Sequence, residues 1–395
     1  MKKKFKQCVL FIWNSAWEMF TLYRMKLSEI KKFKDKRRVE IFSKVVLTTE
    51  QKKAIDSLYE KNYGGRIPYI WHQYYTAYTG NFDANYFPEL LYIPEFEFFM
   101  NLNKKYNATL SDKNILQYFA SVAKVKMPKM KFSCVDGMIK DSEYNLLTRE
   151  DFLNKVSNIG ECFFKPTIDT CSGEGCAVMR IKDGIDLKSG LSTEDIFKAS
   201  NRDWVIQERL CCHESIRNIY SHSVNTFRII TYRWKSSIHH MPVIMRIGRG
   251  GANVDNAHAG GMFIAVSDDG VLHKAAFTEF KEVFSEHPDT LVTFDGYKID
   301  HFGEVIESAK RCHALFPQIG CVNWDFTIDE QGKPVLIEAN IMGGSIWLIE
   351  MAHGRGAFGE STAEVLRWLK KMKHVKRSER KKYMFGNLDD GKNIS

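Results

Sequence analysis

Several motifs that identify common protein classes are missing from this sequence. It contains nine cysteines, but no two of them are spaced as CxxC and no four are spaced to surround a zinc ion. An odd number of cysteines without such pairs is typical of reduced thiols in a cytosolic protein. The sequence also has no basic stripe interleaved with aromatic residues, so we expect no nucleic-acid partner.

A long hydrophobic run is missing too. The apolar stretch from Cys8 to Tyr23 is interrupted by Asn14 and Glu18, whereas a membrane-spanning helix needs about 20 mostly apolar residues. No small-x-small cleavage site follows this stretch, which argues against a signal peptide. We therefore expect a cytoplasmic protein whose only membrane contact is peripheral, on the inner face of the cell membrane.

What the sequence does contain is an uneven distribution of charge. The whole chain carries 57 Lys and Arg against 48 Asp and Glu, a net charge of +9. Residues 1–40 contribute +8 and residues 367–395 contribute +7, which leaves −6 for the residues between them. The chain therefore has two basic ends on a mildly acidic body.

Residues 1–45 predict a basic amphipathic helix. Basic clusters at 2–6 and 31–38 flank the apolar stretch, and the apolar side of the helix carries Val9, Leu10, Trp13, Trp17, Phe20 and Tyr23. This composition is typical of a helix that lies on an anionic membrane surface. The alternative is a helix that docks on the protein's own core and leaves a charged face in solvent.

The remaining chain changes from helical to strand-like patterns. Residues 48–63 have helical spacing, residues 68–106 are rich in aromatic side chains that suit either a core or a sugar-sized pocket, and short β-branched runs recur after residue 160. Further helices are expected near 149–158, 192–199, 301–315 and 361–374. The pattern predicts the α+β class, with antiparallel sheets that have helices on one side.

The segment 322-VNWDFTIDEQGKPVLIEAN-340 predicts a β-hairpin with its turn at residues 329–332. Asp325 and Glu338 then lie opposite one another, and Asn340 shares their face because side chains alternate along a strand. Such an all-oxygen set favours Mg²⁺ that bridges substrate phosphates. The alternative, an ordinary hairpin with solvated acids, fits poorly with the surrounding Trp, Phe, Ile and Leu residues.

Residues suited to phosphate groups lie upstream of this hairpin. Lys165 ends an apolar strand, and the loop after it contains Ser172, Gly173 and Gly175, which lets backbone N–H groups approach phosphate oxygens. This loop is not a Walker loop, because GK[ST] is absent. A second lysine, Lys113, opens a predicted helix directly after an aspartate.

A segment suited to a nucleoside follows at residues 204–210. This hydrophobic strand ends in the polar pair Gln207 and Glu208. Its backbone N–H and C=O groups suit the edge of a purine, and the carboxylate suits a ribose.

Taken in order, these elements resemble the ATP-grasp superfamily. The order and spacing are similar to those of the D-alanine:D-alanine ligase type, over roughly residues 105–370. More narrowly, the segments 223-SVNTFRIITYRW-234, 254-VDNAHAGG-261, 324-WDFTID-329 and 336-LIEAN-340, with the His-Pro pair at 287, resemble the sugar-transfer-associated ATP-grasp proteins of surface-polysaccharide gene clusters. They are similar also to the ATP-grasp protein of teichuronopeptide synthesis.

The resemblance implies a fold in which two α+β subdomains grip ATP between antiparallel sheets. Residues 111–208 correspond to the small subdomain, and residues 209–374 correspond to the C-terminal subdomain with the metal site. They are preceded by the basic helix of residues 1–45 and an aromatic-rich N-terminal domain at 46–110, and they are followed by a basic tail at 375–395.

The resemblance also implies a role for each candidate residue. The ATP ligands would be Lys113, Lys165, Ser172, Gly173, Gly175, Gln207, Glu208 and Leu210, the Mg²⁺ ligands would be Asp325, Glu338 and Asn340, and Arg228, Arg246 and Lys165 would act on the transferred phosphate. Asn225, Asp255, Asn256 and His258 are assigned to the substrate, although His258 equally suits a loop residue without a catalytic role. Asn323 departs from the family, because related ligases often carry an arginine at this place; Arg246 is the candidate replacement.

The implied activity is an ATP-dependent carboxylate–amine ligase that forms an amide through an acyl phosphate. Its partners would be a small amine or amino acid and a sugar-linked carboxylate, such as a uronic acid of a capsule or cell-wall polymer, together with polysaccharide assembly enzymes and an anionic membrane contacted by residues 1–40. Two alternatives remain open: a kinase that phosphorylates a sugar or lipid-linked hydroxyl, and a nucleotide-binding scaffold without turnover.

Overall fold

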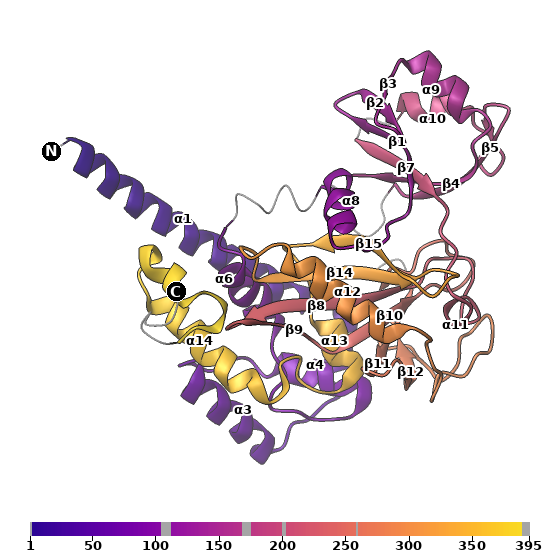
Figure 1. The fold of residues 1–395 in the computed structure, drawn as a ribbon. Coiled ribbons are helices and arrows are strands. Elements are labelled where there is room, and N and C mark those ends of the chain that lie inside the picture. The colour runs from indigo at the N-terminus through magenta and orange to yellow at the C-terminus, as the bar shows by residue number, and fades with distance from the viewer. Residues whose placement is uncertain (1, 104–111, 168–174, 200–202, 258–259, 389–395) are drawn as a thin grey trace.

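The computed structural model describes residues 2–103, 112–167, 175–199, 203–257 and 260–388. It consists of a helical N-terminal region, a small sheet and a large sheet, and the small sheet projects from one end of the body (Figure 1). All pairs of strands within the two sheets are antiparallel. The predicted α+β class with antiparallel sheets is therefore confirmed.

The N-terminal region is built from helices. Its elements are α1 (Lys2–Lys32), α2 (Lys36–Ser43), α3 (Thr49–Asn62), α4 (Ile70–Thr79), α5 (Glu89–Leu91), the π-helical turn η1 (Tyr92–Glu97) and α6 (Phe98–Met100). Helix α3 begins at a capping box, in which the Thr48 side chain accepts from the backbone of Gln51 and the Gln51 side chain accepts from the backbone of Thr48. This pair satisfies two backbone donors that the first turn would otherwise leave unpaired.

The small sheet has the strand order β3-β2-β1-β7-β4-β5-β6. Its strands are β1 (Met130–Val135), β2 (Met138–Asp141), β3 (Leu146–Leu147), β4 (Gly160–Pro166), β5 (Ala177–Lys182), β6 (Ile185–Asp186) and β7 (Trp204–Glu208). Helices α9 (Arg149–Val156) and α10 (Thr193–Ala199) accompany this sheet, and Phe152 of α9 packs on Trp204 of β7 in a separate small core. Helix α8 (Lys113–Val122) precedes the sheet.

The large sheet has the order β13-β12-β11-β10-β8-β14-β15, and β9 also pairs with β8. Its strands are β8 (Thr226–Trp234), β9 (Ser237–His240), β10 (Val243–Ile247), β11 (Met262–Val266), β12 (Leu272–Phe277), β13 (Val283–Phe284), β14 (Cys321–Ile328) and β15 (Pro334–Asn340). The helices around it are α11 (Glu214–Arg217), α12 (Phe302–Ala314), α13 (Trp347–His353) and α14 (Thr362–His374), with the 3₁₀ turns η4 (Gly359–Ser361) and η5 (Arg377–Gly386).

Helices cover both faces of the large sheet, which corrects the expectation of helices on one side. Helix α12 packs with Phe227 and Trp324 on one face. The N-terminal helices, α13 and α14 pack with Ile230 and Phe263 on the other face. Local sequence patterns did not reveal this second layer, because the N-terminal helices join the sheet through contacts between distant parts of the chain.

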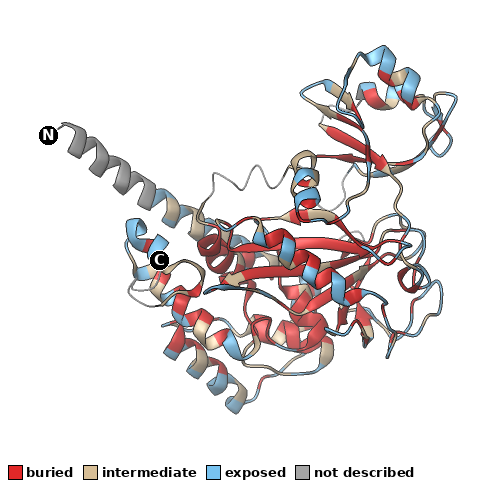
Figure 2. Ribbon diagram, viewed as in Figure 1, coloured by how far each residue is buried: buried red, intermediate tan, exposed pale blue. Residues whose placement is uncertain are grey.

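Most of the aromatic residues that the structure describes between positions 68 and 103 form core rather than a sugar-binding surface. Trp71, Tyr74, Tyr75, Tyr86 and Tyr92 are all fully buried, and the N-terminal helices are correspondingly buried where they face the sheet (Figure 2). These side chains are therefore unavailable to a carbohydrate, and they hold the N-terminal region to the large sheet.

The predicted hairpin is present as β14 and β15. At its turn, the Asp329 carboxylate oxygen Oδ1 accepts hydrogen bonds from the backbone N–H groups of Gln331 and Lys333, at 3.1 and 2.8 Å. Gly332 adopts the positive φ of +73° that closes the turn. The turn at residues 329–332 is confirmed, and it sets the register of the strands that carry the candidate metal ligands.

The segment after α14 packs on the body as η5. Arg380 donates to the carbonyl of Met372 at 3.0 Å, and Trp368 donates its ring N–H to the carbonyl of Tyr383 at 2.6 Å. The expected tail therefore contains a docked segment up to Asn387. Within the part of the chain that the structure describes, no helix is long and apolar enough to cross a membrane.

Candidate active site

A cavity of about 510 Å³ lies between the two sheets. Strands β4, β5 and β7 of the small sheet contribute side chains from one side, and β8, β10, β14 and β15 of the large sheet contribute from the other. Its size is in the range of small-molecule sites. The predicted site residues that line it are Lys165, Gln207, Glu208, Leu210, Arg228, Arg246, Asp255, Asn256, Asp325, Glu338 and Asn340.

Asp325 lies between two arginines in this cavity. Arg228, directly across from Asp325 on β8, donates Nε to Oδ1 at 2.6 Å and Nη2 to Oδ2 at 3.1 Å. Arg246 places its Nη2 3.1 Å from the same Oδ2. Burial raises the pKa of Asp325, but the two guanidinium groups outweigh burial and hold the pKa below its usual range. Asp325 is therefore an ionised anchor that fixes both arginines.

A second carboxylate positions Arg246 through a threonine. Arg246 donates Nη2 to the Thr226 hydroxyl at 2.7 Å, and that hydroxyl donates to Oδ2 of Asp255 at 2.5 Å. Oδ2 of Asp255 also accepts from the backbone N–H of Thr226, at 2.9 Å. Burial raises the pKa of Asp255 although Arg246 opposes the shift. The guanidinium of Arg246 is thus fixed on two sides before any substrate enters.

The predicted oxygen ligands come together on β14 and β15. Asp325 pairs with Glu338 across the hairpin, as the sequence predicted, and a register shift follows immediately at Phe326. Asn340, two residues beyond Glu338, lines the same cavity. The structure therefore confirms that these three side chains line one cavity, as the hairpin predicted.

The donor set fits a magnesium ion. An ionised carboxylate offers about four lone-pair sites, and Arg228 and Arg246 occupy three directions around Asp325. One direction around Asp325 remains for a metal ion, and Glu338 and Asn340 line the same cavity. Among the residues with described positions, no group of three or more His, Cys, Asp or Glu could hold a metal. A bound Mg²⁺ would therefore depend on phosphate and water oxygens for the rest of its shell, as it usually does with nucleotides.

Lys165 lies where the two sheets approach one another. It is 6% exposed at the end of β4, and its Nζ donates to the carbonyl of Ile337 on β15 at 3.5 Å. Ile337 immediately precedes Glu338, so the ammonium group lies beside the candidate metal ligands. This position suits contact with the phosphates of a nucleotide.

Two residues predicted to face the nucleoside hold the segment that precedes β1. Gln207 donates Nε2 to the carbonyl of Pro128 at 3.2 Å. The Glu208 carboxylate accepts from the backbone N–H of Lys129 at 3.1 Å. Both side chains also line the cavity, as does Leu210 beyond the strand. Arg209, which follows Glu208, lines the cavity as well.

Other predicted phosphate ligands are only partly described. Helix α8 begins at Lys113 with Asp112 as its cap, as expected, but the Lys113 side chain, Ser172 and Gly173 lie outside the described residues. Gly175 is described and does not line the cavity. Its φ is +76°, and a Cβ there would meet Pro166 at 3.0 Å, so the chain requires glycine at this point.

The predicted substrate residues separate into two groups. Asp255 and Asn256 line the cavity, whereas His258 lies outside the described residues. Asn225 is fully buried away from the cavity, where it donates to the carbonyl of Tyr220 at 2.8 Å and accepts from the backbone of Gly248 at 3.2 Å. The structure thus gives Asn225 the role of holding two loops together, in place of the predicted contact with substrate.

Asn323 does not reach the cavity, because it faces the N-terminal region. Its Nδ2 lies 3.3 Å from Oε1 of Glu97 and 3.3 Å from the carbonyl of Asn340. Glu97 also accepts from the backbone N–H groups of Gly343 and Gly344, at 2.7 and 3.0 Å. Both glycines line the cavity. Four arginines line the cavity, and the two that contact Asp325, Arg228 and Arg246, lie on other strands than Asn323.

Sequence reasoning missed several lining residues, including Thr226, Ser345 and Trp347. Trp347 opens α13 and is 4% exposed. No short motif marks it, since its place in the cavity depends on the loop after β15. Thr226 lies two residues before Arg228 on the same face of β8, so strand periodicity alone could have indicated it.

Comparison with known proteins identifies the chain's relatives. The model of the family described as sugar-transfer associated ATP-grasp matches residues 94–365. Solved structures that resemble the chain include the VanG D-Ala:D-Ser ligase from Enterococcus faecalis, with 14% identity, a TM-score of 0.39, and coverage of 66% of this chain and 61% of that one. An L-amino acid ligase from Bacillus licheniformis has 14% identity and a TM-score of 0.37, with coverage of 67% and 48%.

A third structure is the N5-carboxyaminoimidazole synthetase from Staphylococcus aureus complexed with ADP, with 13% identity, a TM-score of 0.37, and coverage of 62% and 51%. The chain spans about half the length of most of these solved structures. Likenesses this distant carry no argument about activity. No curated protein matches the chain.

Proposed function

Because the chain belongs to the sugar-transfer-associated ATP-grasp family, we propose that it is an ATP-dependent carboxylate–amine ligase that forms ADP, phosphate and an amide. The observation that carries the proposal is the pair of arginines on Asp325. Two guanidinium groups that are already held in place in one cavity suit a transferring phosphoryl group and a substrate carboxylate. The planar fork of an arginine can bind either a phosphate or a carboxylate bidentately.

The nucleotide would lie between the two sheets. Its adenine would face the backbone beyond Gln207, its ribose would face Glu208, and its phosphates would extend to Lys165. Because Glu208 also accepts from the backbone of Lys129, the same carboxylate would couple the ribose to the start of β1. The phosphates would then end beside Glu338, where Lys165 contacts the preceding carbonyl.

A Mg²⁺ ion held by Asp325, Glu338 and Asn340 would neutralise charge on the transferring phosphoryl group. In the proposed reaction, an oxygen of the substrate carboxylate attacks the γ-phosphorus, and the bond to the ADP oxygen breaks. The amine then attacks the acyl carbon of the resulting acyl phosphate; phosphate leaves, and the amine loses a proton to solvent. Arg228 and Arg246 would stabilise the charge on the phosphoryl oxygens in both steps.

The substrate class we propose is a sugar-linked carboxylate, such as a uronic acid of a surface polysaccharide, joined to an amino acid or another small amine. The support is the family itself together with the arginine pair, since a carboxylate substrate needs a cation to hold it. Tyr220 and Trp347 add aromatic surface to the cavity walls, and such side chains combine an apolar face with a polar edge that can hydrogen-bond.

Hydroxylamine trapping tests the proposal. The protein would be incubated with ATP, Mg²⁺ and a panel of uronic acids, with hydroxylamine in place of the amine. A hydroxamate formed in step with ADP release supports the acyl phosphate. A stable phosphorylated sugar without hydroxamate would instead identify a kinase. Glu338→Gln, which keeps the side-chain shape but removes a charge, should lower ADP release by about 10²-fold or more, and Glu307→Gln on the exposed side of α12 is the matched control.

A further inference from the structure

The long helix α1 contacts the body through its charged side chains. Glu18 pairs with Arg380 and lies 3.4 Å from Arg377, so the acid holds the docked C-terminal segment η5. Lys26 pairs with Glu95 of η1, whose side chain is 2% exposed. Glu29 is buried and bonds Lys32 at 2.7 Å. The side of α1 that faces the protein therefore carries Glu18, Lys26 and Glu29, together with the partly buried Leu22, which packs against the core.

The apolar side of α1 consequently faces solvent. Met19, Phe20, Tyr23, Leu27 and Ile30 recur at intervals of three and four residues, and their exposed fractions are 72%, 52%, 61%, 45% and 39%. Trp17 is 62% exposed, and its ring centre lies 6.2 Å from that of Phe20. We call these six side chains the α1 apolar face. An exposed apolar row of this kind marks an interaction surface.

Basic side chains surround the α1 apolar face. Arg24 is exposed beside it, with its guanidinium 5.8 Å from the ring centre of Phe20. Lys31, Lys34, Lys36 and Arg37 are exposed where α1 ends and α2 begins. Between residues 16 and 47, whose side chains are all described, Glu40 is the only exposed acid, and it pairs with Lys44 at 2.9 Å. The surroundings of the face are therefore strongly positive.

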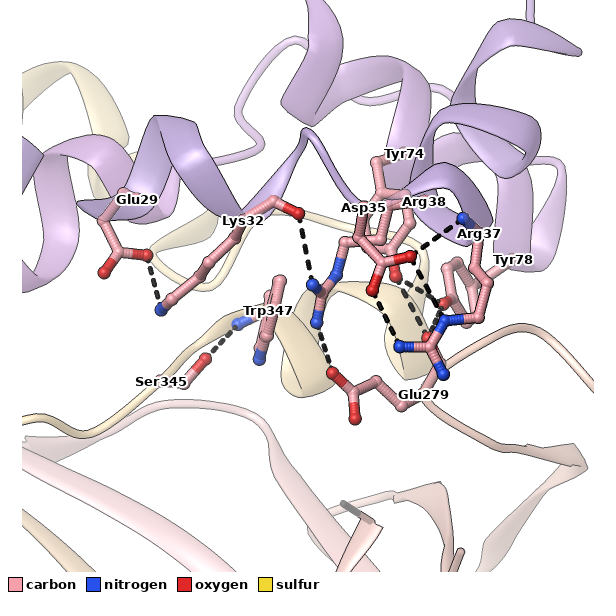
Figure 3. A network of polar contacts seen from close by, with 10 residues as sticks. All are labelled: Glu29, Lys32, Asp35, Arg37, Arg38, Tyr74, Tyr78, Glu279, Ser345 and Trp347. Atoms are coloured by element: carbon pink, nitrogen blue, oxygen red, sulfur yellow. Dashed lines mark hydrogen bonds and ion pairs between the residues drawn. The ribbon is translucent and has the colours of Figure 1, made fainter. Parts of the chain in front are cut away.

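The carboxyl end of α1 is fixed to the wall of the cavity (Figure 3). Lys32, the last residue of α1, has its ammonium 5.3 Å from the ring centre of Trp347, and its carbonyl accepts from Arg38 of α2. Arg38 forms a buried ion pair with Glu279, and its guanidinium lies 4.6 Å from the same ring centre. Tyr74 and Tyr78 donate to the carbonyl of Glu279, at 3.0 and 2.5 Å. Trp347 lines the cavity. Whatever binds α1 therefore acquires a defined position relative to the candidate active site.

We propose that the α1 apolar face is a docking surface for an anionic lipid membrane, on which the helix lies in the plane of the interface. Aromatic and aliphatic side chains beside Lys and Arg are the combination that such a surface binds. A second copy of the chain is disfavoured as the occupant, because pairing two α1 helices would bring two positive surfaces together. The helix is anchored to the body by its other side, so docking leaves the fold unchanged.

Sedimentation of the full chain with vesicles tests this inference, and it needs neither ATP nor substrate. Wild type should co-sediment with vesicles of phosphatidylcholine and phosphatidylglycerol, and binding should fall at least about tenfold with phosphatidylcholine alone, because the basic side chains lose their partners. The variant Met19→Ser/Phe20→Ser/Tyr23→Ser/Leu27→Ser should lose binding to a similar extent while keeping its melting temperature.

The small sheet offers a matched control. Leu146, Ile185, Leu187 and Leu191 are also exposed, by 67%, 45%, 57% and 53%, so replacing these four with serine changes overall surface hydrophobicity to a similar degree. This control should bind vesicles as wild type does. The inference would be overturned if wild type did not co-sediment with anionic vesicles. Equal losses of vesicle binding in both quadruple variants would also overturn it. A dimer in sedimentation equilibrium that the α1 variant abolishes, without vesicle binding, would assign the face to a second copy instead.

Discussion

Glu97 and Gly344 are 247 residues apart in the chain, yet the Glu97 carboxylate accepts the backbone N–H of Gly344 at 3.0 Å. The same carboxylate accepts from Gly343 and Asn323. The N-terminal helical region, which lies largely outside the ATP-grasp subdomains implied by the sequence, therefore holds the loop that lines the candidate active site. The first predictions concern this contact.

Removing the Glu97 carboxylate should destabilise the protein. Glu97→Ala leaves the buried backbone N–H of Gly344 and the part-buried N–H of Gly343 without acceptors, which costs on the order of 1–4 kcal/mol in the free energy of unfolding. Glu97→Gln should cost less, since its carbonyl oxygen still accepts one of these bonds. Urea denaturation followed by circular dichroism measures both. Equal stability of wild type and Glu97→Ala would show that the contact does not hold the loop.

The thermal stability should fall as the pH rises from 6.5 to 8.5. Burial raises the pKa of Glu97 to about 8 and that of Glu89 to about 7, whereas an unfolded glutamate has a pKa near about 4.3. The folded state therefore binds more protons in this window, so stability decreases with pH. The buried histidines His72 and His313, whose pKa burial lowers to about 4, act in the opposite direction, because an unfolded histidine still binds protons near about pH 6.5; this effect fades by about pH 7.5.

Melting temperatures measured across this range check the prediction. Glu97→Gln should have a flatter profile, because its side chain does not titrate, and the difference should approach about 1.4 kcal/mol per pH unit below pH 8. Parallel profiles for wild type and Glu97→Gln would contradict the raised pKa.

Gly344 should tolerate no side chain while Asn323 is present. A Cβ at Gly344 would collide with the Asn323 side chain, so Gly344→Ala should lower stability by about 1–3 kcal/mol through overpacking. Asn323→Ala removes the side chain with which this Cβ would collide, and it also removes the hydrogen bond from Asn323 to Glu97. The double variant should therefore be more stable than the sum of the single effects predicts, which a double-mutant cycle of unfolding free energies measures. Strict additivity would contradict the close approach.

The activity should fall when Arg228 is replaced by lysine, although the positive charge is kept. Arg228→Lys loses the bidentate contact with Asp325 (2.6 and 3.1 Å), and a lysine cannot reproduce the planar fork. We expect hydroxamate formation to fall by about 10²-fold or more, with little change in the affinity for ATP. The control is Arg233→Lys on the same strand; Arg233 donates to the carbonyls of His313 in α12 and Ile319 after it. Similar activity losses in both variants would point to a general structural effect.

The sequence predicted the parts of the site that depend on local periodicity. Asp325 and Glu338 lie opposite one another because both belong to one short hairpin. The turn of this hairpin is set by Asp329, which lies within the same segment. The partners of Asp325 were beyond such reasoning, because the Arg228 pairing joins residues 97 apart. The face of α1 that packs on the body was equally hidden, since its partners Glu95 and Arg380 are 69 and 362 residues away.

The most direct test of the central claim is a calorimetric titration of a non-hydrolysable ATP analogue into wild type, Lys165→Ala and the control Lys310→Ala, each with and without Mg²⁺. Lys310 is on the surface of α12, where it pairs with Glu307 at 3.0 Å. We expect wild type and Lys310→Ala to bind the analogue in a Mg²⁺-dependent manner, and we expect Lys165→Ala not to bind it. Wild type that binds no analogue, or a Lys165→Ala variant that binds as tightly as wild type, would contradict it.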